Sequence, residues 1–335
     1  MIKSLTPIRF ALCMMIFAHH AYGYAGGGAA AVAAFFILSG FCLTIGYKNR
    51  IVSGDFDAFS FFKKRLAKFY SIHWITLIAQ IFVAFGLGTL ALKKRTVIAN
   101  FFLLQSWIPE QSYYFSYNAI AWYLSTALLA YLCFPMLTLF FHKINRTSRI
   151  VTLGGILVAH GVIAYAMPTA HYHAMLYINP CARLIDFIIG MFLADFFMSH
   201  DWSNATRYNG LIDAGIIISF FALNIISIYT PNDYRPIAAI YWFPAAALIL
   251  LTCTADKTSS LLSKCMSWNF TQKSTQCSFS LMMWSIIGIN LLRELNIANG
   301  LWGGAIIFFG VYIVAQISYY LIENKLTTWI VNKVK

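Results

Sequence analysis

The sequence contains few charged residues and very few acidic ones. Only 10% of its 335 residues are Asp, Glu, Lys or Arg, and only 11 are acidic. A soluble globular domain carries about 25% charged residues, so the composition excludes an ordinary soluble fold. The seven cysteines are scattered and form no Cys-x-x-Cys pair, which excludes a disulfide framework and a cysteine-rich zinc site. We expect free thiols instead.

Hydrophobic residues make up 60% of the chain and gather in long runs. A membrane-spanning helix needs about 20 such residues, and runs without strict alternation exclude a transmembrane β-barrel. The sequence therefore predicts an all-α, polytopic membrane helix bundle of about ten transmembrane helices, in one membrane domain over residues 1–335 with no appended soluble domain. The predicted spans are Leu5–Tyr22, Ala29–Tyr47, Tyr70–Leu90, Ala119–Phe141, Ile150–Met167, Ala174–Met198, Gly210–Tyr229, Ile237–Cys253, Ser278–Leu295 and Leu301–Ile322.

Basic residues outnumber acidic ones, 24 to 11, for a net charge of +13. Such a balance suggests nucleic acid as a partner in a soluble protein, but in a membrane protein it reports orientation. Most Lys and Arg fall on one side if both termini are cytoplasmic, and no nucleic-acid partner is expected. The basic, Phe-rich segment Lys48–Lys68 predicts an amphipathic helix on the cytoplasmic face. The apolar segment Val97–Ile108 is too short to cross and is expected to be buried, re-entrant or interfacial.

Two ionisable residues share the first predicted span. Arg9 and His20 are eleven residues apart, about three helical turns plus 20°, so they lie on one face of the helix about 16 Å apart. On one interpretation, Arg9 is an arginine that snorkels to the membrane surface and His20 is an interfacial histidine. On the other, His20 transfers a proton and Arg9 supplies a cation along the same groove. His19 points about 100° away and competes with His20 for the role.

Other polar residues in apolar surroundings have structural explanations. Arg183 and Asp186, three residues apart, are expected to form an intrahelical ion pair instead of a catalytic dyad. His160 is expected to hydrogen-bond a neighbouring helix. His171 and His173 lack nearby Cys, Asp or Glu, so no metal site is predicted.

The order of several short motifs resembles membrane acyltransferase family 3. The family's first span carries Arg, ten residues, then His, which Arg9 and His20 match. An apolar run into Ser-Gly-Phe follows at residues 35–41, and the segment entering the third span is similar to the family's Arg-x-x-Arg, here Arg65 and Lys68. Further similar motifs follow in the family's order at 100–106, 122–125, 186–191, 278–281 and 318–323.

This resemblance implies an integral membrane O-acyltransferase of the bacterial inner membrane. Such an enzyme moves an acyl group, most often acetyl, from cytoplasmic acyl-coenzyme A to a sugar hydroxyl of an envelope polysaccharide or glycolipid. It implies His20 as base or nucleophile together with Arg9, and Arg65 and Lys68 as the residues that bind the donor's phosphates. The competing interpretation of that basic pair is a topological anchor that touches anionic lipid. The implied partners are membrane lipid, acyl-coenzyme A and a glycan acceptor; the oligomeric state is not indicated.

The chain departs from the family pattern at four positions. Lys68 replaces the second arginine, which keeps the charge but loses bidentate phosphate recognition. Ala127 stands where the family usually has glutamate, Ser285 follows Trp284 where the family has histidine, and Asn324 replaces a proline. These departures keep open a non-enzymatic alternative: a transporter or flippase of lipid-linked sugar, or a degenerate relative retained for partner binding.

Overall fold

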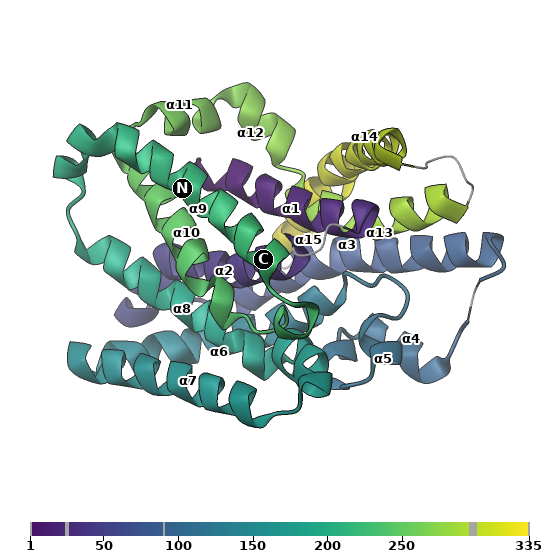
Figure 1. The fold of residues 1–335 in the computed structure, drawn as a ribbon, viewed down its shortest axis with the longest axis horizontal. Helices are drawn as coiled ribbons and strands as arrows, with labels where there is room; N and C mark the ends of the chain where they lie inside the picture. Colours follow the sequence, from purple (N-terminus) through teal and green to yellow (C-terminus); the bar gives the residue numbers. More distant parts are fainter. Residues whose placement is uncertain (1, 24–26, 90, 295–299, 334–335) are drawn as a thin grey trace.

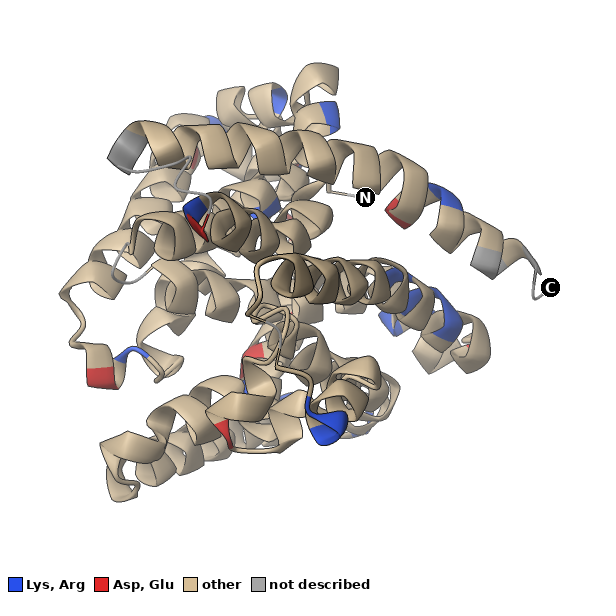
Figure 2. Cartoon of the chain, turned by 90° about the vertical axis from the view of Figure 1, so that its right-hand side faces the viewer, with Lys and Arg blue, Asp and Glu red and all other residues tan. Residues whose placement is uncertain are grey.

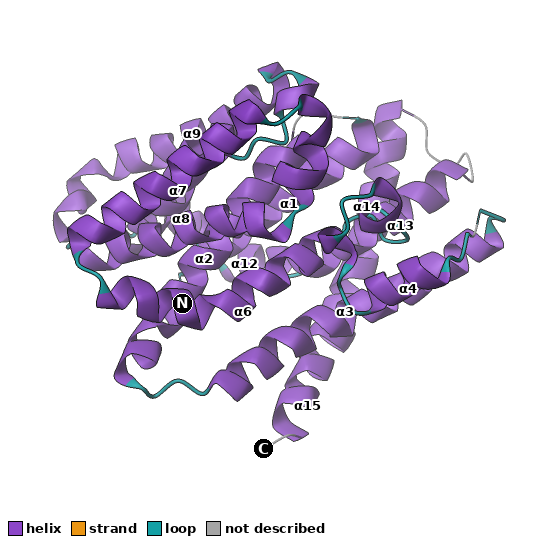
Figure 3. Cartoon of the chain, turned by 90° about the horizontal axis from the view of Figure 1, so that it is seen from below, coloured by secondary structure: helices purple, strands orange, loops and turns teal. Residues whose placement is uncertain are grey.

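The computed structural model is a bundle of α-helices and describes residues 2–23, 27–89, 91–294 and 300–333. Within these ranges the chain forms helices, turns and loops and no strand (Figures 1 and 3). The all-α membrane helix bundle expected from the composition is thus confirmed. The long helices are α1 (Leu5–Tyr22), α2 (Gly27–Ser53), α3 (Ala58–Gly86), α6 (Trp122–Lys143), α7 (Arg146–Ala166), α8 (Pro180–Ser199), α9 (Asn209–Tyr229), α10 (Ala239–Thr258), α13 (Ser278–Glu294) and α14 (Gly300–Ser318). The shorter ones are α4 (Lys94–Phe101), α5 (Gln111–Tyr114), α11 (Leu261–Ser267), α12 (Asn269–Thr275) and α15 (Lys325–Lys333), with π-helical turns at His173–Ile178 and Tyr319–Asn324.

Each predicted span overlaps one of these long helices, but the count of ten crossings is not confirmed. Of the described residues, seven helical segments are long and apolar enough to cross a membrane, or eight if α12 and α13, bent by 42°, form one span. Helices α1 and α8 are not among them. The reason is polar content, because α1 contains Arg9, His19 and His20, and α8 contains Arg183, Asp186 and Asp195. Elsewhere charged residues are sparse along the ribbon (Figure 2).

The basic segment Lys48–Lys68 does not form the separate amphipathic helix that we expected. Helix α2 continues to Ser53, and α3 begins at Ala58, where the Asp57 carboxylate accepts a hydrogen bond from the Ser60 amide at 2.9 Å. Within the segment, Phe61 is buried and its ring centroid lies 5.1 Å from that of Tyr47, whereas Phe59 is 68% exposed. The prediction of a separate helix was therefore wrong, because the segment is divided between the end of α2 and the first turns of α3.

The apolar segment Val97–Ile108 forms the short helix α4 and a single turn at Gln105–Trp107. The buried ring of His73 on α3 holds it, with Nε2 2.8 Å from the Asn100 carbonyl oxygen. An eight-residue helix is too short to cross a bilayer. The expectation of a non-crossing segment is confirmed.

Helix α2 lies at the centre of the bundle and packs closely on α8. A Cβ added at Gly40 would lie 2.0 Å from the Phe187 carbonyl oxygen, and one added at Gly190 would lie 1.9 Å from the Ile37 carbonyl oxygen. Backbone therefore meets backbone at this crossing, which only glycine permits. Small residues at helix contacts are how membrane helices approach closely.

Candidate active site

A cavity of about 560 Å³ opens among α1, α2, α3, α6 and α13. Its wall contains three cations, Arg9, Arg65 and Lys68, and the described lining residues include no Asp or Glu. Aromatic and aliphatic side chains form most of the remainder. The volume lies within the roughly 300–1,000 Å³ range of small-molecule sites. The structure thus brings the basic pair of α3 and the arginine of α1 to one place, although 56 residues separate Arg9 from Arg65 in the chain.

Arg65 is held by aromatic rings instead of by a carboxylate. Its guanidinium carbon lies 5.6 Å from the ring centre of Tyr47, 5.5 Å from that of Phe61 and 5.7 Å from that of Tyr131. The Arg65 Nε atom is buried and makes no hydrogen bond within the described part of the chain. Cation–π contacts orient a guanidinium but satisfy none of its N–H donors. Arg65 therefore has donors available for an anionic ligand.

The positive charge of Lys68 is partly compensated by Glu323. Its Nζ lies 3.1 Å from Oε1 of Glu323, whose side chain is 5% exposed, while the Lys68 side chain is 44% exposed. The other carboxylate oxygen of Glu323 accepts a hydrogen bond from Ser280 at 2.9 Å. Residue spacing did not predict this contact, because Glu323 lies in the π-helical turn after α14, far along the chain from α3. Glu323 fixes the position of Lys68 at the cavity wall.

Arg9, on the α1 wall of the cavity, contacts a cysteine sulfur. Its NH2 group donates to Cys42 Sγ at 3.0 Å, and the neighbouring Cys13 thiol donates to the Ser278 carbonyl oxygen at 3.1 Å. Cys13 and Ser39 also line the cavity. Because a thiol compensates a guanidinium only weakly, the positive charge of Arg9 remains available to a ligand in the cavity.

His20 does not line this cavity. The wall on α1 ends at Cys13, which is seven residues or about 10 Å along the helix from His20. The buried Phe17 occupies the same helix face between them. The ring of His20 instead lies 5.0 Å from that of His19, between centroids. The Arg9 and His20 positions therefore share a helix face, as the spacing predicts, but the cavity reaches only Arg9.

Arg293, in the last turn of α13, contacts the end of α1. Its NH2 group donates to the His20 carbonyl oxygen at 2.9 Å and also to the Ala21 carbonyl oxygen. A cation that binds the unpaired carbonyls of a helix C-terminus stabilises that end. Arg293 thereby holds the turn that carries His20. No local pattern in the sequence indicated this role, since the two residues are 273 positions apart.

Ala127 is buried in α6 and is 1% exposed. It is not among the residues that line the cavity. The preceding Thr126 is also buried and donates to the Ile178 carbonyl oxygen at 2.9 Å. Ser285, at the family's histidine position, is likewise buried and donates to the Met282 carbonyl oxygen at 2.8 Å. Both departures from the family pattern are thus accommodated inside the helix bundle.

The remaining polar candidates are structural. Arg183 and Asp186 form the expected ion pair at 2.9 Å, fully buried, and the Trp242 indole donates to the same carboxylate. His160 makes no hydrogen bond through Nε2 in the described residues, so the expected bond to a neighbouring helix is not found there. Its ring instead faces Trp242 of α10, with centroids 5.3 Å apart. The described residues contain no group of three or more His, Cys, Asp or Glu that could hold a metal ion.

Comparison with known proteins supports the resemblance noted in the sequence. The chain is 26% identical over 247 residues to the acyltransferase MdmB of Streptomyces mycarofaciens, covering 68% of this chain and 60% of that protein. It is 22% identical over 347 residues to the putative peptidoglycan O-acetyltransferase YrhL of Bacillus subtilis, covering 95% of this chain and 54% of that protein. The chain thus spans little more than half the length of these relatives, and no solved structure matches it. The model of the acyltransferase domain family matches residues 2–322, so the chain belongs to this family, as the resemblance to membrane acyltransferase family 3 predicted.

Proposed function

We propose that this protein is an integral membrane O-acyltransferase. It transfers an acyl group, most often acetyl, from cytoplasmic acyl-coenzyme A to a sugar hydroxyl of an envelope polysaccharide or glycolipid. The observation that carries this proposal is the cavity of about 560 Å³ that joins Arg9, Arg65 and Lys68 to aromatic and aliphatic walls. Coenzyme A combines phosphates with a long, weakly polar arm, so it requires both kinds of surface.

Arg65 and Lys68 bind the donor's phosphates in this proposal. The unpaired donors of Arg65 suit a phosphate, because guanidinium and phosphate form bidentate hydrogen bonds. The arm of the donor then runs into the cavity toward Cys13 and Arg9. There the guanidinium of Arg9, about 16 Å from His20 along α1, donates hydrogen bonds to carbonyl oxygens of the donor's arm and orients the arm toward His20.

His20 takes the proton of the acceptor hydroxyl. The sugar oxygen attacks the thioester carbonyl carbon, the carbon–sulfur bond breaks, and the thiolate of coenzyme A leaves and receives a proton. Since about 10 Å of α1 separates Cys13 from His20, the acyl arm must pass Phe17 before the reacting groups meet. The acceptor reaches His20 from the outer side, in a bacterial inner-membrane protein whose termini are both cytoplasmic. The name of the Bacillus subtilis relative supports a glycan acceptor.

Acetyl transfer by the purified full chain tests the proposal. The protein, reconstituted in liposomes with acetyl-coenzyme A and an envelope glycan, is expected to increase the mass of the glycan by acetyl groups. His20→Ala is expected to abolish the transfer. His171→Ala, which changes an exposed histidine in the turn Thr169–His171, serves as the matched control and is expected to leave the transfer intact. Unchanged acetylation by the His20→Ala protein would refute the role of His20.

Donor binding is tested separately from chemistry. Arg65→Ala with Lys68→Ala is expected to raise the dissociation constant for acetyl-coenzyme A, whereas Lys64→Ala, a neighbouring exposed lysine outside the cavity wall, is expected to leave it unchanged. Equal binding by the wild type, the double variant and Lys64→Ala would mean that the basic pair serves only as a topological anchor that orients the protein in the membrane. No transfer by the wild-type chain, combined with movement of lipid-linked sugar across the liposome membrane, would instead support the transporter alternative.

A further inference from the structure

A second cavity is separate from the candidate active site. Its volume is about 560 Å³, it is formed by α7, α8 and the end of α2, and it shares no lining residue with the first. It has a charged end and an apolar wall. Nothing in the proposed acyl transfer uses it.

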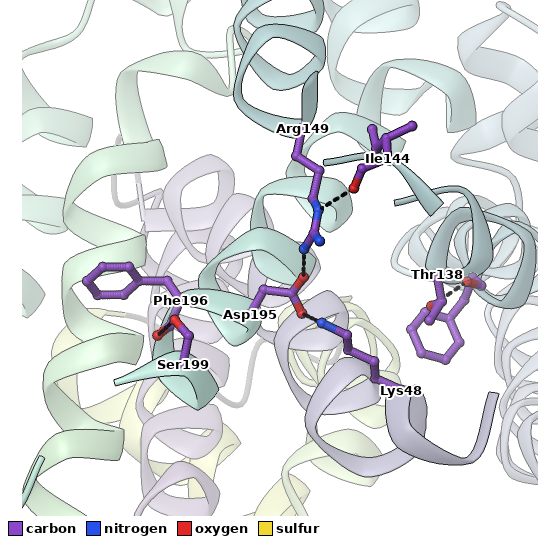
Figure 4. Close-up of polar contacts among 8 residues, drawn as sticks. Lys48, Thr138, Ile144, Arg149, Asp195, Phe196 and Ser199 are labelled. Carbon is purple, nitrogen blue, oxygen red and sulfur yellow. Dashed lines mark hydrogen bonds and ion pairs between the residues drawn. The ribbon is translucent and has the colours of Figure 1, made fainter. Parts of the chain in front are cut away.

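Three cations and one carboxylate form the charged end. Lys48 Nζ lies 2.6 Å and Arg149 NH1 3.4 Å from the two carboxylate oxygens of Asp195 (Figure 4). Arg149 Nε also donates to the Ile144 carbonyl oxygen at 3.1 Å, which directs its guanidinium toward α8. Asp195 thus holds Lys48 and Arg149 side by side and cancels only one of their charges.

Arg146 adds a third positive charge to the lining. It is exposed, and no ion pair within the described part of the chain involves it. Three cations against one carboxylate leave an excess of two positive charges at this end of the cavity. The excess fits a ligand that carries negative charge.

Apart from Ser199, the rest of the wall is apolar. It consists of side chains from the facing sides of α7 and α8: Ile150, Leu153, Ile189, Phe192, Leu193 and Phe196. Helix α7 lies at the edge of the bundle (Figure 1), and only His160 and Ala164 are buried among its residues. Ile150 is 61% and Phe196 43% exposed, so the groove opens sideways, toward the lipid in a membrane.

We propose that this groove binds an anionic phospholipid, with the phosphate on Arg146 and Arg149 and one acyl chain between α7 and α8. The apolar part of the groove runs along α8 from Ile189 to Phe196, seven residues or about 10 Å. That length is about two thirds of the roughly 15 Å that one leaflet contributes to the hydrocarbon core. One acyl chain of one leaflet therefore fills the apolar part while its headgroup reaches the cations. Basic pockets between membrane helices bind anionic headgroups in this way.

The occupant is a lipid and not a free phosphate, because a free phosphate would leave the apolar wall uncovered. A zwitterionic lipid would cover the wall but would not use the excess positive charge. Charge and chain thus make separate contributions, and each can be removed by itself. Arg146→Gln removes charge without touching the Asp195 contacts, and Leu153→Trp fills the groove without changing charge.

Lipid titration of the purified full chain in neutral detergent, followed by native mass spectrometry, tests this proposal. The wild-type protein is expected to retain phosphatidylglycerol more strongly than phosphatidylcholine of the same chain length. Arg146→Gln is expected to weaken phosphatidylglycerol binding about fivefold, the effect of one cation at a membrane surface. Leu153→Trp is expected to weaken binding of both lipids. The matched control is Arg50→Gln, which changes an exposed arginine at the end of α2 outside the groove and is expected to bind as the wild type does.

Three results would overturn the proposal. The first is equal retention of the two lipids by the wild-type protein. The second is unchanged phosphatidylglycerol binding by both Arg146→Gln and Leu153→Trp, with circular dichroism that confirms folded protein. The third is displacement of phosphatidylglycerol by millimolar inorganic phosphate, which would assign the charged end to a free anion.

Discussion

The Arg183–Asp186 pair offers the sharpest test of how this bundle tolerates charge. The side chains are 1% and 0% exposed, and their charged atoms are 2.9 Å apart. Asp186→Asn preserves shape and an acceptor for Trp242 but leaves the arginine buried without its counter-charge. Removal of one partner from a buried pair costs about 3–5 kcal/mol of unfolding free energy. The rings of Phe36 and Tyr177, 5.3 and 5.1 Å from the guanidinium carbon, offset part of that cost, on the order of 1–2 kcal/mol.

We therefore expect Asp186→Asn to destabilise the protein by about 1–4 kcal/mol. Arg183→Met with Asp186→Asn removes both charges and is expected to recover most of this loss, because neither buried charge remains uncompensated. Unfolding of each variant in mixed micelles, followed by circular dichroism, yields the double-mutant cycle. The reasoning would be refuted if the double variant lost as much unfolding free energy as Asp186→Asn and Arg183→Met lose in sum.

Further predictions concern the glycine contact, the end of α1 and the cavity. Gly190→Ala is expected to lower the unfolding free energy by at least about 1–3 kcal/mol, because its Cβ would lie 1.9 Å from a carbonyl oxygen. The control is Gly161→Ala on α7, where an added Cβ meets nothing within 4 Å. In the same unfolding assay this control is expected to be neutral or stabilising. Arg293→Gln is expected to speed hydrogen exchange at the C-terminal turn of α1 and to lower acetyl transfer, and unchanged exchange there would contradict its capping role. Arg65→Gln is expected to raise the dissociation constant for acetyl-coenzyme A about tenfold, in line with loss of about 1.5 kcal/mol from a charged hydrogen bond, and an unaltered constant by calorimetry would exclude Arg65 from the donor site.

Local patterns predicted most of the helices but not how they meet. The apolar run predicted both bounds of α1, Leu5 and Tyr22, because hydrophobicity acts over a few residues. The same patterns failed at Lys48–Lys68, because amphipathicity does not distinguish a membrane surface from the surface of a neighbouring helix. Here the ring of Phe61 on α3 packs against that of Tyr47 on α2, a contact that the pattern of the segment did not reveal.

In the candidate site, too, the sequence predicted individual residues but not the contacts between helices. The family resemblance pointed to Arg65 and Lys68 as a basic pair, and both line the cavity. The partners that fix them come from distant segments: Tyr131 from α6 and Glu323 from beyond α14. Contacts of this kind depend on how the helices pack, which spacing within one helix does not encode. For the same reason, the face shared by Arg9 and His20 did not predict that the cavity would end at Cys13.

The central claim is that acyl-coenzyme A occupies the cavity among Arg9, Arg65 and Lys68. A coenzyme A thioester with a short photoreactive acyl chain, irradiated with the purified full chain, measures this directly when the labelled peptides are identified by mass spectrometry. The account predicts adducts on cavity residues such as Cys13, Ser39 or Tyr123, reduced by excess acetyl-coenzyme A and by Arg65→Ala with Lys68→Ala. Adducts confined to segments outside this cavity, or adducts insensitive to acetyl-coenzyme A, would contradict it.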